Sequence, residues 1–387
     1  MLASRRHFLR AAALLAAPNL VFAQAATERR FVFIIQRGAA DGLNIVIPYA
    51  EPAYAARRGA LAIDPAAAFK LDATFALHPS LTDLAGLYKS GQAAFFQAVA
   101  SPYRDRSHFD GQNVLETGGS APYVLKDGWI NRLLGARSRP GKDAIAFATT
   151  VPTAMRGNIE VPSYAPSTLP QASDDLLMRV DQLYGEDAQL HALWSAAREA
   201  RNIAAGMTQE SGRQEPAELG RIAASFLGRK DGPRIAMIET SGWDTHSAQN
   251  DRLAAQLDKL NSLVAALRQG LGPVWDQTVI LVATEFGRTV AVNGTGGTDH
   301  GTGAAAMLIG GAVRGGRVVT DWPGLAPANL LEGRDLKPTL GLDSLIAQTC
   351  AEVFEADPER MKRILFPDAV KGKPLPQLLR GRAANAT

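Results

Sequence analysis

Near the start of the chain stand Phe31-Val32-Phe33-Ile34-Ile35, a continuous apolar run followed closely by Gly38 and Asp41. An apolar run without polar alternation is typical of a strand that is buried on both faces, as in a parallel sheet. Similar runs recur at 93–99, 144–148, 235–238, 279–282 and 304–309. Between two of them, the segment 253–267 places an apolar residue at every third or fourth position, which indicates a crossover helix. We therefore expect an α/β protein, a three-layer α/β/α sandwich around a mostly parallel central sheet.

The 387 residues are expected to form one large domain and a short tail after the N-terminal leader. The pattern of strands and helices predicts one large α/β domain over 26–381. Within it, the region of about 152–214 has few apolar runs and long polar helical stretches, so we expect a helical insertion or cap there. We expect a disordered tail over 382–387.

Residues 1–25 have the three zones of an export signal: a basic start, a short apolar middle and a small-residue end. Paired Arg5 and Arg6 before Phe8-Leu9 resemble a twin-arginine signal, and Ala23-Gln24-Ala25 has the form of a cleavage site. The apolar middle is too short to span about 30 Å of hydrocarbon as a helix. We expect a protein that is periplasmic or otherwise exported through the twin-arginine translocase, with no membrane span in the mature chain. An uncleaved amphipathic helix is the alternative.

Composition and charge exclude several classes of protein. The chain is 46% hydrophobic and 20% charged, an ordinary globular composition that excludes collagen-like, coiled-coil and wholly disordered proteins. Without the three arginines of the leader, 38 basic residues face 38 acidic ones. Near-neutral charge gives no electrostatic basis for a nucleic-acid partner or an anionic membrane. Cys350 is the only cysteine, which excludes an internal disulfide and a cysteine-rich metal site.

Polar residues follow three of the predicted strands. Asp41 follows the first, Asp244 and His246 follow the run that ends at Ile238, and Glu285 follows Val282. The carboxyl ends of parallel strands meet at one edge of a sheet, where three carboxylates would repel one another. A cation resolves that conflict, and oxygen with imidazole ligands suits a divalent ion, zinc or manganese.

Two further segments are candidates for the same site. The glycine-rich segment 294–303 contains Asp299 and His300, and the segment after Val99 contains Arg106-Ser107-His108. Each feature also has an ordinary structural explanation, since Asp41 and Ser107 are both suitable helix caps and Asp299-His300 suits a turn.

These segments together resemble a known family. The motifs Arg106-Ser107-His108-Phe109, Gly242-Trp243-Asp244-Thr245-His246, Glu285-Phe286-Gly287-Arg288-Thr289 and Gly297-Thr298-Asp299-His300-Gly301 are similar to those of exported bacterial proteins classed as domain of unknown function 1501. More loosely, their order along the chain resembles the alkaline phosphatase superfamily, which includes sulfatases.

The superfamily resemblance implies one or two divalent ions beside a hydroxyl nucleophile that attacks a phosphate or sulfate ester. One ion would take Asp244, His246 and His300, and the other Asp41, Ser107 and Glu285. Ser107 would be the nucleophile, because a metal lowers the pKa of a hydroxyl. Arg106 or Arg288 would hold the anion bidentately.

The sequence departs from the superfamily pattern at two metal-ligand motifs. Asp244 and His246 are two residues apart, where the usual pair is Asp-x-x-x-His. Where a metal ligand Asp-His-Gly is usual, the chain reads Glu285-Phe286-Gly287, and either His108 or Asp299 could replace the missing histidine. Whether the protein is an enzyme is therefore left open. The first expectation is a metal-dependent hydrolase of a small anionic ester or an envelope-derived substrate. The alternative is a non-catalytic metal-binding or envelope-assembly protein on the same fold.

The export signal gives a direct prediction. Replacing both leader arginines, Arg5→Lys with Arg6→Lys, should leave the precursor in the cytoplasm, because the paired arginines are the feature that marks this route. Cell fractionation measures the outcome, and normal export of the double variant would exclude a twin-arginine signal.

Overall fold

A computed structural model describes residues 28–137, 143–165, 215–369 and 374–381, together with the isolated residues 180, 184, 190, 191, 194 and 195. The expected leader, most of the expected helical insertion and the expected tail lie outside the described residues. Within the described part of the chain, no helix combines the length and apolar character needed to cross a bilayer.

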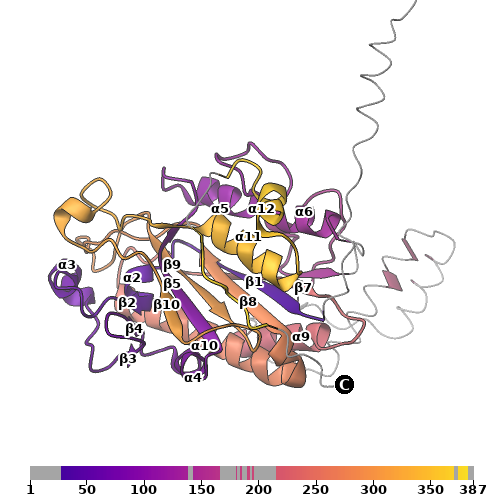
Figure 1. The fold of residues 1–387 in the computed structure, drawn as a ribbon, viewed down its shortest axis with the longest axis horizontal. Helices are drawn as coiled ribbons and strands as arrows, with labels where there is room; N and C mark the ends of the chain where they lie inside the picture. Colours follow the sequence, from indigo (N-terminus) through magenta and orange to yellow (C-terminus); the bar gives the residue numbers. More distant parts are fainter. Residues whose placement is uncertain are drawn as a thin grey trace, which may run out of the picture.

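A central sheet of eight strands runs through the molecule in the order β10-β5-β9-β8-β1-β7-β6, with β11 also paired to β5 (Figure 1). Its strands are β1 (Arg30–Arg37), β5 (Ala93–Ala100), β6 (Ala144–Phe147), β7 (Ile235–Ser241), β8 (Thr278–Thr284), β9 (Ala304–Ile309), β10 (Arg317–Val319) and β11 (Leu340–Gly341). Only β9 runs antiparallel to its neighbours. The predicted mostly parallel sheet is confirmed, and all six apolar runs are strands of it.

Helices cover both faces of this sheet, which confirms the predicted three-layer sandwich (Figure 1). One layer contains α5 (His108–Thr117), α6 (Trp129–Gly135), α11 (Leu342–Val353) and α12 (Pro358–Leu365). The other contains α4 (Thr82–Lys89), α9 (Pro216–Leu227) and α10 (Gln249–Leu271). Helix α10 is the predicted crossover between β7 and β8.

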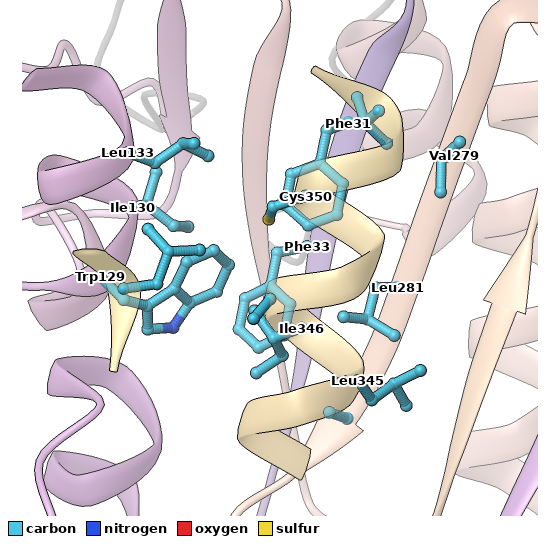
Figure 2. Packing of buried hydrophobic residues seen from close by; sticks show 14 of the residues in the cluster. Phe31, Phe33, Trp129, Ile130, Leu133, Val279, Leu281, Leu345, Ile346 and Cys350 are labelled. Atoms are coloured by element: carbon cyan, nitrogen blue, oxygen red, sulfur yellow. The ribbon is translucent and has the colours of Figure 1, made fainter. Parts of the chain in front are cut away.

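Strand β1 explains why both layers are needed. Its side chains alternate, so that Phe31 and Phe33 enter one hydrophobic cluster while Val32 and Ile34 enter the other. On the first face, the ring of Phe33 meets Trp129 edge-on, with centroids 5.2 Å apart. Figure 2 shows these rings enclosed by side chains of α6 and α11. A strand buried on both faces needs the continuous apolar run that the sequence shows.

A smaller antiparallel sheet flanks the main one. It has the order β2-β4-β3 and consists of β2 (Val46–Ile47), β3 (Phe69–Lys70) and β4 (Ala76–Leu77), accompanied by α2 (Gly42–Ile45) and α3 (Tyr54–Arg58). Helix α2 packs directly on β9, where a Cβ on Gly42 would lie 2.5 Å from the backbone nitrogen of Ala305. These strands are too short to show a pattern in the sequence.

The topology gathers one set of loops at one edge of the sheet. Because β1, β5, β7 and β8 are parallel and β9 is antiparallel, the carboxyl ends of the first four lie beside the amino end of β9. In open α/β sheets this edge is where ligands bind. All the predicted site residues follow or precede these strand ends.

Candidate metal centre

Three histidines from three separate segments converge on the carboxylate of Asp244. His246 follows β7 and places its Nε2 atom 3.0 Å from Asp244 Oδ1. His300 precedes β9 and places Nε2 3.3 Å from the same oxygen. His108 begins α5 and places Nε2 3.4 Å from Asp244 Oδ2. The structure thus joins His108 to the three residues that the family resemblance grouped around one ion.

Each imidazole turns its Nδ1 atom to an oxygen outside this centre. The three pairs are His108 with Glu285 Oε1 (2.8 Å), His246 with Asp299 Oδ1 (3.2 Å), and His300 with the backbone carbonyl of Arg106 (2.9 Å). A carboxylate and a carbonyl oxygen only accept hydrogen bonds, so the partners assign the proton to Nδ1 in each neutral ring. Each Nε2 atom then presents a lone pair to the centre.

These lone pairs face one another at close range. The Nε2 atoms of His246 and His300 are 3.0 Å apart, a distance at which two lone pairs repel unless a proton or a metal ion binds them. Among the residues that the structure describes, the Nε2 atom of His108 is shut off from solvent and has no hydrogen-bond partner. Ligand atoms of His108, Asp244 and His300 all lie within 4.8 Å of one another. The donor set of imidazole and carboxylate therefore fits a divalent metal ion.

Arg288 holds Asp244 in its charged form. The guanidinium is fully buried and donates from Nη1 to Asp244 Oδ1 at 2.5 Å, while its Nε donates to Thr298 at 3.1 Å. Burial alone would raise the pKa of Asp244, but the hydrogen bond and charge of Arg288 outweigh it and lower that pKa. Arg288, expected to hold an anion, thus contacts the carboxylate of the centre itself.

Glu285 supports His108 from behind. Its carboxylate is fully buried and accepts from the backbone N–H of Gly38 (2.9 Å), Gln112 Nε2 (3.1 Å) and Thr284 Oγ1 (3.0 Å), in addition to His108. Burial raises the pKa of Glu285, but these donors outweigh it and lower the pKa. A carboxylate that accepts from the outer nitrogen of a ligand histidine is a common second layer of metal sites.

Two of the histidines around Asp244, His108 and His300, differ in basicity. The hydrogen bond to Glu285 raises the pKa of His108. Burial, followed by the charge of His108, lowers the pKa of His300. His300 therefore keeps its Nε2 lone pair over a wider range of pH than an exposed histidine does.

Asp41 lies at the same edge of the sheet, but its carboxylate has other partners. Oδ1 accepts from the backbone N–H of Leu43 at 3.1 Å and caps α2, so the helix-cap explanation describes its local role. Oδ2 accepts from the guanidinium of Arg58 and from Gln249, and both Asp41 and Arg58 are buried. The structure does not bring Asp41 into the histidine centre, because an internal cation already balances its charge.

Ser107 occupies the N-cap position of α5, yet its hydroxyl makes no capping hydrogen bond. Its two neighbours in sequence both contact the centre, Arg106 through the backbone carbonyl and His108 through the ring. The side chain of Arg106 turns elsewhere, with Nη2 at 2.9 Å from Asp335 Oδ2 and 2.6 Å from Glu332 Oε2. Arg106 is therefore engaged in ion pairs, whereas the hydroxyl of Ser107 is left without a capping role.

Phe286, where the sequence departs from the pattern expected of a metal ligand, stacks against His108. The two rings stack with centroids 5.1 Å apart and an interplanar angle of 21°. Phe286 is buried among Ala39, Tyr103 and Val114. Of the two replacements that the sequence left open, the structure places His108 among the inner groups and Asp299 behind His246.

Glycine in the segment 294–303 serves close packing. A Cβ on Gly297 would lie 2.3 Å from the backbone of His246, so only glycine lets this segment approach the strand end that carries Asp244. The glycines thus bring His300 up to His246.

Comparison with known proteins gives one family match. A family model described as a protein of unknown function, DUF1501, matches residues 28–364. No curated protein sequence matches the chain.

Solved structures resemble the chain at low sequence identity. They include an alkaline phosphatase superfamily protein from Vibrio parahaemolyticus (13% identity, 74% of this chain and 61% of that chain, TM-score 0.38), the C-terminal periplasmic domain of EcEptC from Escherichia coli in complex with zinc (10%, 76% and 77%, 0.38), and alkaline phosphatase from the Antarctic bacterium TAB5 (10%, 86% and 99%, 0.38). The chain thus covers less than two thirds of the Vibrio protein.

The buried pair of Asp41 and Arg58 gives a prediction that separates it from the metal centre. Arg58→Met should lower the free energy of unfolding by about 3–5 kcal/mol, because it leaves a buried carboxylate without its counter-charge. Urea denaturation measures this loss. The neighbouring, partly exposed Arg57 supplies the control, since Arg57→Met should change stability by about 0.5 kcal/mol or less. Zinc affinity of the folded Arg58→Met protein should equal that of the wild type, and a loss of zinc binding would place Asp41 back in the metal site.

Proposed function

The chain belongs to the DUF1501 family, and on that premise we propose that it is a hydrolase that binds one divalent metal ion through His108, Asp244, His246 and His300. The observation that carries this proposal is the 3.0 Å approach of two imidazole Nε2 atoms whose outer nitrogens both face acceptors. Two facing lone pairs repel unless a proton or a metal ion binds them, and a divalent ion would also use the Nε2 atom of His108 and the carboxylate of Asp244.

One ion, rather than two, fits the surroundings. The second ion implied by the superfamily resemblance would need Asp41 and Glu285. Asp41 is paired with Arg58, and Glu285 is saturated by His108 and its other donors. Asp41 therefore has its counter-charge, and the oxygens of Glu285 are already occupied by hydrogen bonds, without a second metal.

The centre is open to a substrate. The side chains of Asp244 and His246 keep 41% and 43% of their surface exposed, so the inner groups are reached from solvent. A divalent ion held there would supply Lewis acidity to a substrate oxygen.

We assign the nucleophile to Ser107 and the substrate to the class of phosphate or sulfate esters, a small anionic ester or an envelope component. The order of the sequence motifs supports this class, and the free N-cap hydroxyl beside His108 supports the residue. The Ser107 oxygen would bond to phosphorus or sulfur as the alcohol leaves with a proton, and water would then release the acid and restore the hydroxyl. Export to the periplasm belongs to this proposal through the expected leader.

A second candidate is a metal-binding protein without catalysis that serves envelope assembly. The engagement of Arg106 and Arg288 in ion pairs favours it, because neither guanidinium is free to hold an anionic group. The two candidates share the metal centre and differ in what Ser107 does.

Metal removal tests the shared centre. A chelator should lower the melting temperature of the metal-loaded protein, and added zinc or manganese should restore it, because an ion that binds only the native state stabilises it by about 2.7 kcal/mol at 100 times its dissociation constant. Differential scanning calorimetry with metal analysis measures both the shift and an expected stoichiometry of one ion per chain.

Two histidine variants give the matched comparison for that experiment. His300→Ala should weaken the response to metal, whereas His191→Ala, at an exposed position outside the centre, should leave it unchanged. A metal-loaded wild type whose melting temperature ignores the chelator would contradict the metal centre and the hydrolase together.

Ser107→Ala separates the two candidate functions. A nucleophilic serine predicts that ester hydrolysis is abolished while stabilisation by metal persists, since Ser107 is not among the four groups around the ion. Hydrolysis of aryl phosphate and aryl sulfate esters measures the activity. Full activity in the variant would exclude the nucleophile, and an inactive wild type that still binds metal would favour the assembly protein.

A further inference from the structure

A hydrogen-bonded chain runs from β1 to the metal centre through Gln112. Arg37, the last residue of β1, donates from Nη1 to Gln112 Oε1 at 2.9 Å. Gln112 then donates from Nε2 to Glu285 Oε1 at 3.1 Å. The same Glu285 oxygen lies 2.8 Å from Nδ1 of His108. Gln112 thus stands between a fixed guanidinium and the acceptor that orients an inner histidine.

The amide of Gln112 can take only one orientation in this series of hydrogen bonds. A guanidinium has donors and no acceptor, so the amide oxygen must turn to Arg37. The amide nitrogen must then turn to Glu285, and the donor it presents matches the carboxylate. The orientation is fixed by the partners, so it holds in the metal-free protein as well.

Arg37 is itself anchored on its other sides. Nη1 lies 2.8 Å from Glu116 Oε1, and Nε donates to Glu239 Oε1 on β7 at 3.1 Å. Glu116 is buried and its second oxygen accepts from the backbone N–H of Ala154 at 3.0 Å. The guanidinium therefore links β1, β7 and α5, and Gln112 extends this rigid link to Glu285.

Helix α5 places Gln112 and His108 so that both side chains contact Glu285. They are four residues apart on α5, so their side chains lie on the same face, one turn from each other. Asn113, the next residue, points elsewhere and accepts from the backbone N–H of Tyr123 at 2.7 Å. Two adjacent amide side chains of one helix thus have separate duties, which supplies a matched control.

We infer that Gln112 is a positioning residue of the metal centre. Held by Arg37, it fixes Glu285 Oε1 where that oxygen accepts from Nδ1 of His108, and so keeps the Nε2 lone pair of His108 directed at Asp244. This inference rests on the proposed metal centre and adds a residue to it that does not touch the ion.

Zinc titration of the metal-free protein by calorimetry tests the inference. Gln112→Met keeps the length of the side chain but neither donates nor accepts, and it should weaken zinc affinity about tenfold, the lower end of what loss of an outer-layer partner costs. Gln112→Glu presents a second carboxylate to Glu285, and this variant should bind zinc as weakly as Gln112→Met or more weakly. Asn113→Met should stay within about twofold of the wild type.

A second readout needs no metal. At a pH above the raised pKa of His108, nitrogen-15 NMR of the histidine side chains should show its neutral ring as the single Nδ1–H tautomer in the metal-free wild type and as a mixture of tautomers in Gln112→Met. If the wild type binds zinc and Gln112→Met binds it within twofold of Asn113→Met, the inference is overturned while the metal centre stands. If the wild type binds no zinc, the proposed function fails, and an unchanged His108 tautomer in Gln112→Met overturns the positioning role as well.

Discussion

The Nε2 atoms of His246 and His300 lie 3.0 Å apart because each ring is held from outside, by Asp299 and by the carbonyl of Arg106. Since these outer partners only accept, each neutral ring keeps its proton on Nδ1, and only a proton or a metal ion at Nε2 relieves the repulsion. Asp244 brings a negative charge to the same point, and Arg288 keeps that charge in place. A group of this kind is costly to assemble without a positive charge and inexpensive with one. The hydrogen bonds around the centre thus direct three Nε2 atoms and one carboxylate toward a common point, where a cation would fit.

The sheet topology makes that assembly possible. Asp244 and His246 come from the end of β7, Glu285 from the end of β8, and His300 from the start of β9. These residues are far apart in sequence, and the antiparallel direction of β9 is what returns His300 to the edge where the parallel strands end. The strands are packed on both faces, so the core holds the strand ends, and the side chains that follow them, in fixed positions.

Apolar runs predicted the strands of the main sheet because a strand covered on both faces admits no polar alternation. Strand ends likewise predicted which segments meet, since parallel strands share an edge. What each side chain does there depended on partners that no spacing reveals. Asp41 pairs with Arg58, which arrives from another helix, and His108 depends on stacking against Phe286. Gln112 could have been found from its helical spacing to His108, but only once His108 was known to face the centre.

Glu285 differs from the other carboxylates at this edge of the sheet in having no arginine partner among the described residues. Four other carboxylates at this edge each have an arginine partner: Asp41 with Arg58, Asp244 with Arg288, Glu116 with Arg37, and Asp335 with Arg106. Among the described residues, the hydrogen bonds and ion pairs of Glu285 come instead from neutral donors and from His108. Its negative charge therefore acts through one imidazole, making the Nε2 atom of that ring a stronger ligand. A cation in the centre would in turn offset the cost of burying the charged Glu285. The charge of Glu285, at the buried end of β8, is therefore coupled to occupancy of the exposed metal centre.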